Sequence, residues 1–434
     1  MTKMANAKLS CPALFVAAPA SGQGKTTVVA ALARLHTRLG RRVRVFKCGP
    51  DFLDPQIHAI ASGAPCQNVD LWMCGADDIA WRLAEAARDA DLIFVEGVMG
   101  LFDGTPSAAE LATRLGIPIL AVINGASMAN SFGAIAYGLK HYRPGTPVNA
   151  AFANCVGSAY HAELLEKSLP ADIAWYGHLP RDVDAAMPER HLGLLPAAEI
   201  EGLAQRIEHM ADLLAATAAA NLPPPVAFDD VPPPVLPPLL ADKTIAIARD
   251  AAFCFLYPAN LDCLERLGAT LKYFSPLADA ALPECDAVWL PGGYPELHGP
   301  ALAANRSLWQ SLAAHVDAGR PVLAECGGMM ALFETLGDVK GNEHRLAGLL
   351  PGQVRMQKRL AGLGMQEVEL PEGRLRGHAF HYSKTETMLE PIATSMRPDG
   401  RTGEAIHRRQ RLTASYMHLY FPSNPEAVAR LFSR

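Results

Sequence analysis

Short apolar runs alternate with segments of helix length along most of this chain, and this alternation restricts the folds open to it. In the N-terminal half, six runs predict strands, at residues 14–18, 43–47, 92–96, 117–123, 148–154 and 173–179. Helix-length segments, such as residues 26–39 and 77–90, separate them. Continuous apolar runs of this length are typical of a parallel sheet covered by helices on both faces.

The same alternation returns in the C-terminal half. Strands are predicted there at residues 244–248, 287–290 and 321–325, and helices near residues 258–267 and 302–316. We therefore predict an α/β protein with two doubly wound domains. A chain of 434 residues also exceeds what one hydrophobic core usually organises.

The sharpest change of composition lies at residues 221–240, where eight prolines fall between Leu222 and Leu239. Such a segment cannot form a helix or a central strand, and it tends toward extended polyproline conformation. We predict a linker here, with one domain at residues 1–220 and the other at residues 241–434.

Charge and cysteine content exclude several classes of protein. A net charge of -5 provides no overall field for nucleic acid or an anionic membrane. Nine cysteines without a C-x-x-C pair indicate reduced thiols and a cytoplasmic location. The uncharged run at residues 115–139 is interrupted by glycine, proline and asparagine, so we expect no membrane span.

A glycine-rich segment follows the first predicted strand and opens the first predicted helix. It consists of Ser21, Gly22, Gln23, Gly24, Lys25, Thr26 and Thr27. Glycines let backbone N–H groups approach phosphate, a lysine pairs with the outer phosphates, and a threonine hydroxyl ligates Mg²⁺. Pro19 replaces the first glycine of the usual motif, so this is a variant phosphate loop. The alternative is a strand-to-helix turn without a ligand.

Acidic residues follow two of the predicted strands. Asp51 and Glu96 stand where parallel strands end, and together with Thr26 they are the predicted Mg²⁺ ligands. We assign Asp54 and Asp103 to contacts with the substrate. The alternatives are a helix cap for Asp54, a solvated loop residue for Asp51 and a turn-forming residue for Asp103.

A cysteine in the C-terminal half has the setting of a nucleophile. Cys326 lies between a predicted strand and a helical pattern, on a turn that would expose its thiol and lower its pKa. Gly292 and Gly293 are the predicted oxyanion site, and His418 is the predicted base. Tyr420 occupies the position two residues beyond His418, so no carboxylate there orients the imidazole. A buried inert cysteine and a structural histidine are the alternatives.

Taken together, these residues resemble the cobyrinate a,c-diamide synthase family, including its hydrogenobyrinate version. The N-terminal half looks like the ATP-dependent fold shared with dethiobiotin synthetase. The C-terminal half resembles a class I glutamine amidotransferase of the variant that lacks the usual acid after its histidine. The resemblance is carried by the motifs at residues 19–27, 47–55, 96–104, 250–260, 291–296, 324–328 and 376–383.

The resemblance implies a two-site reaction. ATP would phosphorylate a carboxylate of a corrinoid substrate, and ammonia released from glutamine by Cys326 and His418 would convert it to an amide. In this family an asparagine that ends a late strand contacts adenine, and Asn154 is the candidate. ATP and Mg²⁺ are the implied cofactors. The resemblance leaves open whether the chain forms a homodimer.

Two other readings remain. A nickel-sirohydrochlorin a,c-diamide synthase would perform the same chemistry on another macrocycle. A partition-type switch ATPase would carry a second lysine early in the phosphate loop, where this chain has Ala20. The amidotransferase half has no place in such a switch.

Overall fold

The protein divides into two compact units, residues 1–234 and 235–434. The computed structural model describes residues 8–182, 189–190, 193–194 and 196–433. The division falls within the proline-rich segment, and each unit is described below by itself.

The first unit is built on a parallel sheet with the strand order β3-β2-β4-β1-β5-β6-β7. Its strands are β1 (Lys8–Ala17), β2 (Val43–Cys48), β3 (Gln67–Val69), β4 (Leu92–Glu96), β5 (Ile119–Asn124), β6 (Val148–Val156) and β7 (Ala174–Pro180). The six predicted strands are present. β3 was not predicted, because three residues are too few to show a pattern.

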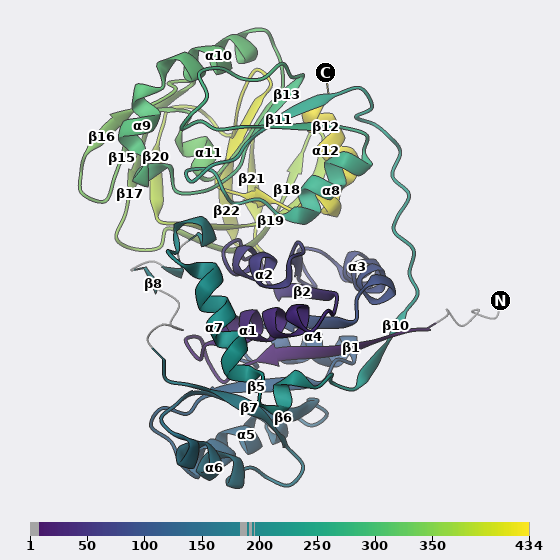
Figure 1. Cartoon of the computed structure of the whole chain (residues 1–434). Helices are drawn as coiled ribbons and strands as arrows, with labels where there is room; N and C mark the ends of the chain where they lie inside the picture. The colour runs from purple at the N-terminus through teal and green to yellow at the C-terminus, as the bar shows by residue number, and fades with distance from the viewer. Residues whose placement is uncertain (1–7, 183–188, 191–192, 195, 434) are drawn as a thin grey trace, which may run out of the picture. The chain divides into compact units, whose positions relative to one another are not determined.

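Helices cover both faces of this sheet, as Figure 1 shows for α1 and α7 on one side and α5 and α6 on the other. Leu14, Val16 and Phe94 of the sheet pack in one buried cluster with residues of α1, α2 and α7. The helices are α1 (Lys25–Arg38), α2 (Asp54–Ser62), α3 (Ala76–Asp89), α4 (Ala108–Leu115), α5 (Ser131–His141), α6 (Ala159–Lys167) and α7 (Leu203–Leu214). Two short strands, β8 (Glu189–Arg190) and β9 (Gly193–Leu194), pair antiparallel.

The proline-rich segment is not only a spacer, contrary to the prediction. Its strand β10 (Pro225–Asp229) pairs antiparallel with the first half of β1. Pro225 is the first residue of this strand, where a missing N–H is tolerated. Val226 and Phe228 alternate inward and are buried, while Asp229 forms an exposed ion pair with Lys8 at 2.6 Å. The prolines flank this short stretch rather than interrupting it.

The second unit contains a ten-stranded sheet in the order β12-β11-β13-β14-β23-β22-β21-β18-β19-β24. The five strands β12 to β23 in this order are parallel, which confirms the predicted α/β half, although β12 and β23 were not among the predicted strands. The bounds are β11 (Thr244–Ala248), β12 (Thr270–Phe274), β13 (Ala287–Leu290), β14 (Val322–Glu325), β18 (Gly362–Leu370), β19 (Gly373–His381), β21 (Ala393–Met396), β22 (Thr402–Arg409), β23 (Leu412–Ser415) and β24 (His418–Leu419).

The antiparallel half of this sheet was not predicted. Its long strands β18 and β22 mix buried, half-buried and exposed residues and so lack the continuous apolar runs that mark the parallel strands. A second, four-stranded sheet has the order β16-β15-β17-β20. Its strands are β15 (Phe333–Gly337), β16 (Glu343–Arg345), β17 (Leu350–Met356) and β20 (Ser383–Glu386).

Alternate residues of β11 face two different helical layers. Ala246 and Ala248 pack in a cluster with residues of α9, α10 and α11, whereas Ile245 and Ile247 pack with residues of α8 and α12. Figure 1 shows α9 and α12 on opposite sides of the sheet. The helices are α8 (Pro258–Arg266), α9 (Gly299–Ala304), α10 (Arg306–Asp317), α11 (Gly327–Met330) and α12 (Pro425–Phe432).

The single helix predicted over residues 302–316 is wrong, because α9 ends and α10 begins around Asn305. The side-chain oxygen of Asn305 accepts a hydrogen bond from the Leu308 N–H at 3.4 Å. Its amide donates to the carbonyls of Pro276 and Asp279, each at 2.8 Å. Asparagine is a favoured helix N-cap, so this residue starts a new helix.

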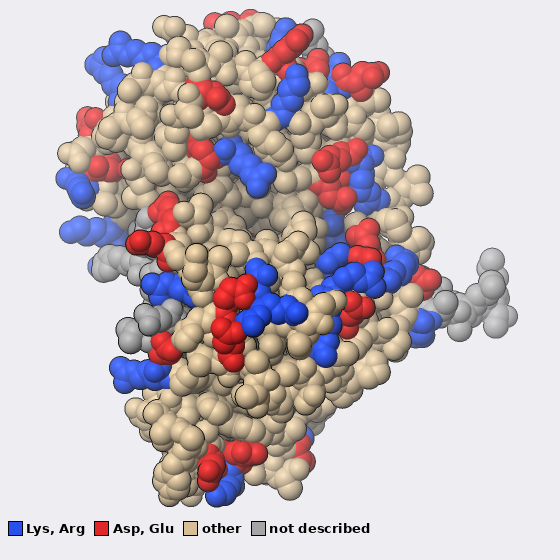
Figure 2. All heavy atoms as spheres, in the orientation of Figure 1, with Lys and Arg blue, Asp and Glu red and all other residues tan. Residues whose placement is uncertain are grey.

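No helix in the described ranges is long and apolar enough to cross a membrane. On the face of each unit seen in Figure 2, basic and acidic side chains are interspersed. This distribution agrees with the small net charge of the sequence.

Candidate active sites

The glycine-rich loop of the first unit connects β1 to α1, as predicted. Gly24 has a φ of 86°, in the left-handed region that favours glycine. A Cβ atom at this position would lie 2.0 Å from Nδ2 of Asn154. That nitrogen donates to the carbonyl of Gln23 at 3.0 Å. Asn154 therefore holds the loop closely against the end of β6, and its predicted contact with adenine stays a prediction.

Lys25 and Thr26 begin α1 and extend toward two different partners. The Lys25 Nζ donates to the carbonyls of Met99 at 2.7 Å and Ala20 at 3.4 Å. Burial lowers the pKa of Lys25, against the opposing charge of Glu96. The Thr26 hydroxyl donates to Oε1 of Glu96 at 3.0 Å. The loop lysine is thus partly desolvated, and anionic oxygen would be a stronger partner for it than the two carbonyls.

Glu96 is the centre of a buried network of charged side chains. The Lys47 Nζ lies 2.8 Å from its Oε1, and the Nε2 of His58 pairs with its Oε2. Burial by itself would raise the pKa of Glu96, but the charges of Lys47 and His58 hold it well below its usual range. Glu96 is therefore ionised, as a carboxylate that binds a metal ion must be.

Lys47 and His58 were not singled out from the sequence. Lys47 also lies 2.5 Å from Oδ2 of Asp54 and 3.9 Å from Oδ2 of Asp51. Burial opposes the charge of Lys47, yet the three surrounding carboxylates raise its pKa well above the usual value. A lysine at the end of an otherwise apolar strand was the available signal.

The two aspartates of this segment have different surroundings. Oδ1 of Asp51 accepts hydrogen bonds from the N–H groups of Leu53 and Asp54, at 2.8 and 3.1 Å, at the start of α2. Asp54 is buried and paired with Lys47, and burial, with the neighbouring charge of Asp51, raises its pKa well above the usual value. Asp54 thus braces Lys47 in this structure, whereas it was predicted to contact the substrate.

The side chains around Glu96 match the chemistry of a magnesium site. Thr26, Asp51 and Glu96 offer oxygen donors, which Mg²⁺ prefers, and Lys47 joins the two carboxylates into one network. Within the described residues, no group of three or more His, Cys, Asp or Glu side chains is arranged to hold a metal ion. Mg²⁺ usually takes only one or two carboxylates and completes its shell with phosphate oxygens and water. These residues therefore fit an ion that arrives with a nucleotide.

Asp103 lies on a loop that packs against the phosphate loop. Its Oδ2 accepts a hydrogen bond from the Gly100 N–H at 3.0 Å, and the Leu101 N–H donates to the Ala18 carbonyl at 2.8 Å. The negative charge of Asp103 also acts on Lys25. The residue thus forms a turn, which was the alternative reading, and still lies near the predicted phosphate site.

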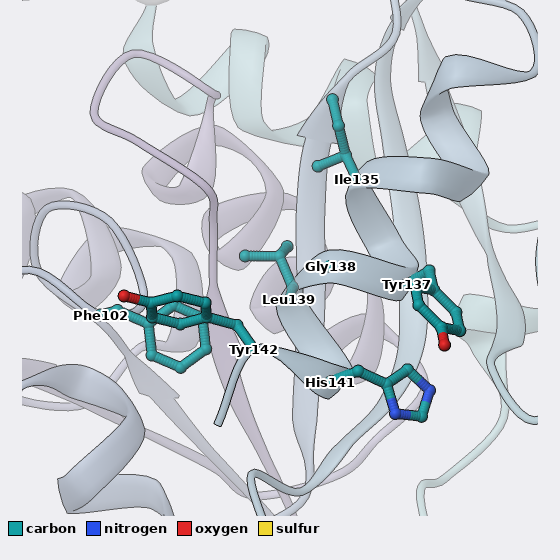
Figure 3. A pocket seen from close by; sticks show the side chains of 7 residues that line it. All are labelled: Phe102, Ile135, Tyr137, Gly138, Leu139, His141 and Tyr142. Carbon is teal, nitrogen blue, oxygen red and sulfur yellow. The ribbon is translucent and has the colours of Figure 1, made fainter. Parts of the chain in front are cut away.

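An apolar pocket of about 560 Å³ lies beside this loop. In Figure 3 the ring of Phe102 lies against that of Tyr142, at a centroid distance of 4.9 Å. The guanidinium of Arg143 lies 5.3 Å from the centre of the Phe102 ring. The pocket is lined by Phe102, Ile135, Tyr137, Gly138, Leu139, His141 and Tyr142.

In the second unit, Cys326 occupies a sharp turn between β14 and α11. Its φ of 45° is rare for a residue other than glycine, and such strain is concentrated at functional sites. The predicted exposure and lowered pKa are wrong, because Cys326 is only 5% exposed. Burial raises the pKa of its thiol, and the charge of Glu296 adds to this effect. The thiol therefore needs a nearby base to lose its proton.

The predicted oxyanion loop lies between the cysteine turn and the predicted base. A Cβ atom on Gly292 would lie 2.3 Å from Cε1 of His418. A Cβ atom on Gly327, the residue after Cys326, would lie 2.9 Å from the backbone nitrogen of Gly293. The structure thus brings the three predicted parts of this site together, and glycine is required where they meet.

His418 is buried on β24, and burial, with the nearby His378 and His381, lowers its pKa well below the usual value. Its imidazole is therefore neutral, which is the form that can act as a base, but the same burial weakens it as a proton acceptor. Next to it, the Glu325 carboxylate accepts hydrogen bonds from the Leu419 N–H at 2.8 Å and the Trp289 indole at 3.0 Å. Burial raises the pKa of Glu325 to about 8.

Comparison with known proteins shows which class of protein this chain belongs to. A family described as CobB/CobQ-like glutamine amidotransferase domain matches residues 244–426. These residues include β14 with Cys326, the oxyanion loop and His418. The second unit is therefore a glutamine amidotransferase domain, joined to an α/β unit that carries a glycine-rich loop.

Relatives extend the similarity to the whole chain. The chain is 57% identical over 424 residues to hydrogenobyrinate a,c-diamide synthase of Pseudomonas aeruginosa, covering 98% of each chain. It is 57% identical to the enzyme of that name from Stutzerimonas stutzeri, covering 97% of this chain and 98% of that one. It is 48% identical to cobyrinate a,c-diamide synthase of Herminiimonas arsenicoxydans, covering 97% and 96%. The chain belongs to the cobyrinate and hydrogenobyrinate a,c-diamide synthase family.

Proposed function

We propose that this protein converts the a and c carboxylates of cobyrinate or hydrogenobyrinate to amides in cobalamin biosynthesis, with ATP as the energy source and glutamine as the ammonia source. The observation that carries the proposal is the similarity to these synthases over 97–98% of this chain, and two clusters of candidate residues support it. One is the phosphate loop with its buried acid network, and the other is the Cys326 turn with His418.

The first unit would activate the carboxylate. A carboxylate oxygen of the substrate attacks the γ-phosphorus of ATP, the bond to ADP breaks, and an acyl phosphate forms. Lys25 stabilises negative charge on the transferred phosphoryl group. Thr26, Asp51 and Glu96 would hold Mg²⁺, which neutralises phosphate charge when bound. Lys47 keeps the Glu96 carboxylate ionised and in place.

Ammonia then completes the reaction on the substrate. Its lone pair attacks the carbonyl carbon of the acyl phosphate, the bond to the phosphate oxygen breaks, and the amide and phosphate are released. The carboxylate oxygen alone would be a poor leaving group, so the amide forms only after phosphorylation.

The second unit would generate the ammonia. His418 accepts the proton of the Cys326 thiol, and the sulfur attacks the side-chain amide carbon of glutamine. The backbone amides of Gly292 and Gly293 would stabilise the oxyanion. His418 returns the proton to the departing ammonia, and water hydrolyses the glutamyl thioester to glutamate. Because burial raises the pKa of the thiol, the transfer to His418 is essential.

We place the corrin ring beside Asp103. Phe102, the preceding residue, presents an aromatic ring to the apolar pocket of Figure 3, which suits an apolar face of a macrocycle. Arg143 adds a positive charge at this place, which suits a polycarboxylate. Asp103 itself repels carboxylates, so we assign it to positioning the side chain that reacts or the incoming ammonia.

The decisive experiment replaces the nucleophile of one site only. Cys326→Ser should abolish synthesis from glutamine and leave synthesis from ammonium salts intact, because only ammonia release needs the thiolate. Cys263→Ser, which alters another buried cysteine of the same unit, is the matched control. Equal loss with both nitrogen donors would contradict the two-site proposal.

The ring specificity is tested with the unaltered protein. Cobyrinate, hydrogenobyrinate and nickel-sirohydrochlorin are supplied separately with ATP, Mg²⁺ and glutamine, and the amides formed are counted by mass spectrometry. Two amides on either of the first two substrates support the proposal. Amidation of nickel-sirohydrochlorin alone would favour the nickel enzyme instead.

A further inference from the structure

His418 is a base without a carboxylate two residues further along the chain, where Tyr420 stands. An imidazole that takes and returns a proton needs its ring plane fixed, and in other enzymes a neighbouring acid has this role. We propose that His378 is the positioning residue for His418 and that Tyr257 fixes His378 in turn. This inference rests on the proposed glutaminase role of Cys326 and His418.

The strand register places the two histidines opposite each other. β19 and β24 are antiparallel neighbours in which His378 pairs with His418. Their rings are stacked, with centroids 4.9 Å apart and planes inclined by 17°. Both residues are 2% exposed. Because both rings are held by paired backbone and excluded from water, rotation of His418 would disrupt a packed interface.

A hydrogen bond fixes the orientation of His378. The hydroxyl of Tyr257 and the Nδ1 of His378 are 3.0 Å apart, and Tyr257 immediately precedes α8. Tyr257 is 1% exposed. The path from α8 through Tyr257 and His378 to His418 is therefore a continuous series of buried contacts.

The charge state of His378 suits this role. Burial lowers the pKa of His378 to about 3, so the ring is neutral at physiological pH. A second imidazolium at this position would repel the imidazolium that His418 becomes when it accepts the thiol proton, and a neutral His378 does not add this repulsion.

Glu325 and His381, two other ionisable groups near His418, have partners of their own. Glu325 accepts hydrogen bonds from the backbone of Leu419 and from Trp289. His381 lies 3.2 Å from Glu404 and is stacked on Tyr416 at 3.7 Å. Each of these groups supports a neighbouring part of the site. His378 is the one whose ring lies face to face with that of His418.

Three variants test the proposal by graded removal of the contacts. His378→Ala removes the stacked ring, His378→Phe keeps a flat ring but removes the hydrogen bond, and Tyr257→Phe removes only the hydroxyl. Misplacing a catalytic group by about 1 Å costs about a hundredfold in rate, so we expect about a hundredfold loss in glutaminase kcat for His378→Ala. The other two variants should lose about tenfold or less, with the KM for glutamine unchanged in all three.

A second readout does not depend on turnover. Alkylation of Cys326 by iodoacetamide requires proton loss from the thiol, so its rate should fall in the same order as kcat. Cys326→Ser gives the background from the other cysteines. Synthesis from ammonium salts should be unchanged in every variant. His407→Phe alters another buried histidine of the same sheet and is the control for packing damage.

The outcomes separate this proposal from the one on which it rests. If Cys326→Ser abolishes glutamine use but His378→Ala and Tyr257→Phe keep the kcat of the unaltered protein, the positioning role is refuted and the glutaminase stands. The role is also refuted if His407→Phe lowers alkylation as much as His378→Phe does, or if His378→Phe is no better than His378→Ala. If Cys326→Ser keeps glutamine use, the proposed glutaminase itself fails.

Discussion

Lys47 provides the most direct test of the buried network around Glu96. Its side chain is 4% exposed and lies 2.8 Å from Glu96 and 2.5 Å from Asp54, whose side chains are 1% and 7% exposed. Lys47→Met keeps most of the apolar stem but leaves two buried carboxylates without their shared cation. Removing one partner of a buried ion pair costs about 3–5 kcal/mol of unfolding free energy. For a unit of this size, that corresponds to a fall in Tm of about 6–20 °C.

The same strand offers a matched control. Arg44 of β2 lies 2.5 Å from Asp89, but the side chains are 31% and 52% exposed. Exposed ion pairs contribute about 0–1 kcal/mol, so Arg44→Met should cost little. The two variants therefore differ mainly in the burial of the pair that is lost.

Hydrogen exchange read by mass spectrometry measures the effect within each unit. In Lys47→Met, peptides from β2 and β4 should lose protection, while peptides from β14 in the other unit serve as an internal reference. Glu96→Gln combined with Lys47→Met should recover part of the loss, because it removes one uncompensated charge. If Lys47→Met costs no more than Arg44→Met, the network does not have the energetic role argued here.

Three further predictions concern the first unit. Lys25→Ala should abolish amide formation from both glutamine and ammonium salts, since it removes charge stabilisation from the transferred phosphoryl group. Glutamine hydrolysis should remain measurable. Undiminished synthesis from ammonia would show that the glycine-rich loop is only a turn. Asp103→Asn should let the monoamide accumulate with the KM for ATP nearly unchanged, and Phe102→Ser should raise the KM for the corrinoid without this change in product. A normal diamide yield from Asp103→Asn would refute its positioning role, and a concentration-dependent change of oligomeric state in Phe102→Ser would assign the pocket to a contact between copies of this chain.

The sequence predicted the parallel strands well because a strand buried on both faces is apolar along its whole length. β13 is apolar throughout, β11 after its first residue and β4 up to its last, whereas β2 also carries Arg44 and Lys47. The antiparallel strands β18 and β22 contain many polar and half-buried residues, and this weaker pattern is common in ordinary surface segments. The break at Asn305 was missed because the apolar periodicity continues from α9 into α10. The hydrogen bonds of Asn305, and not the apolar periodicity, therefore determine where the second helix begins.

Some residues of the candidate sites could be predicted from the sequence and others could not. Residues that belong to loop motifs, such as Lys25 and Cys326, are recognisable because their chemistry requires a particular neighbour in the chain. Lys47, Tyr257 and His378 act through contacts with residues 49, 121 and 40 positions away, respectively. No local spacing encodes such contacts. The charge state of Cys326 was also mispredicted, because burial depends on the whole fold rather than on the adjacent helix.

In both units, a buried side chain supports a reactive group through a neighbouring strand. Lys47 at the end of β2 holds Glu96 at the end of β4, and the two strands are paired in register at these residues. His378 of β19 faces His418 of β24 across a paired position as well. A paired strand fixes the separation of opposite side chains without a flexible loop between them. For this reason we expect substitutions at Lys47 and His378 to impair function by displacing Glu96 and His418, although neither residue would touch a reacting atom.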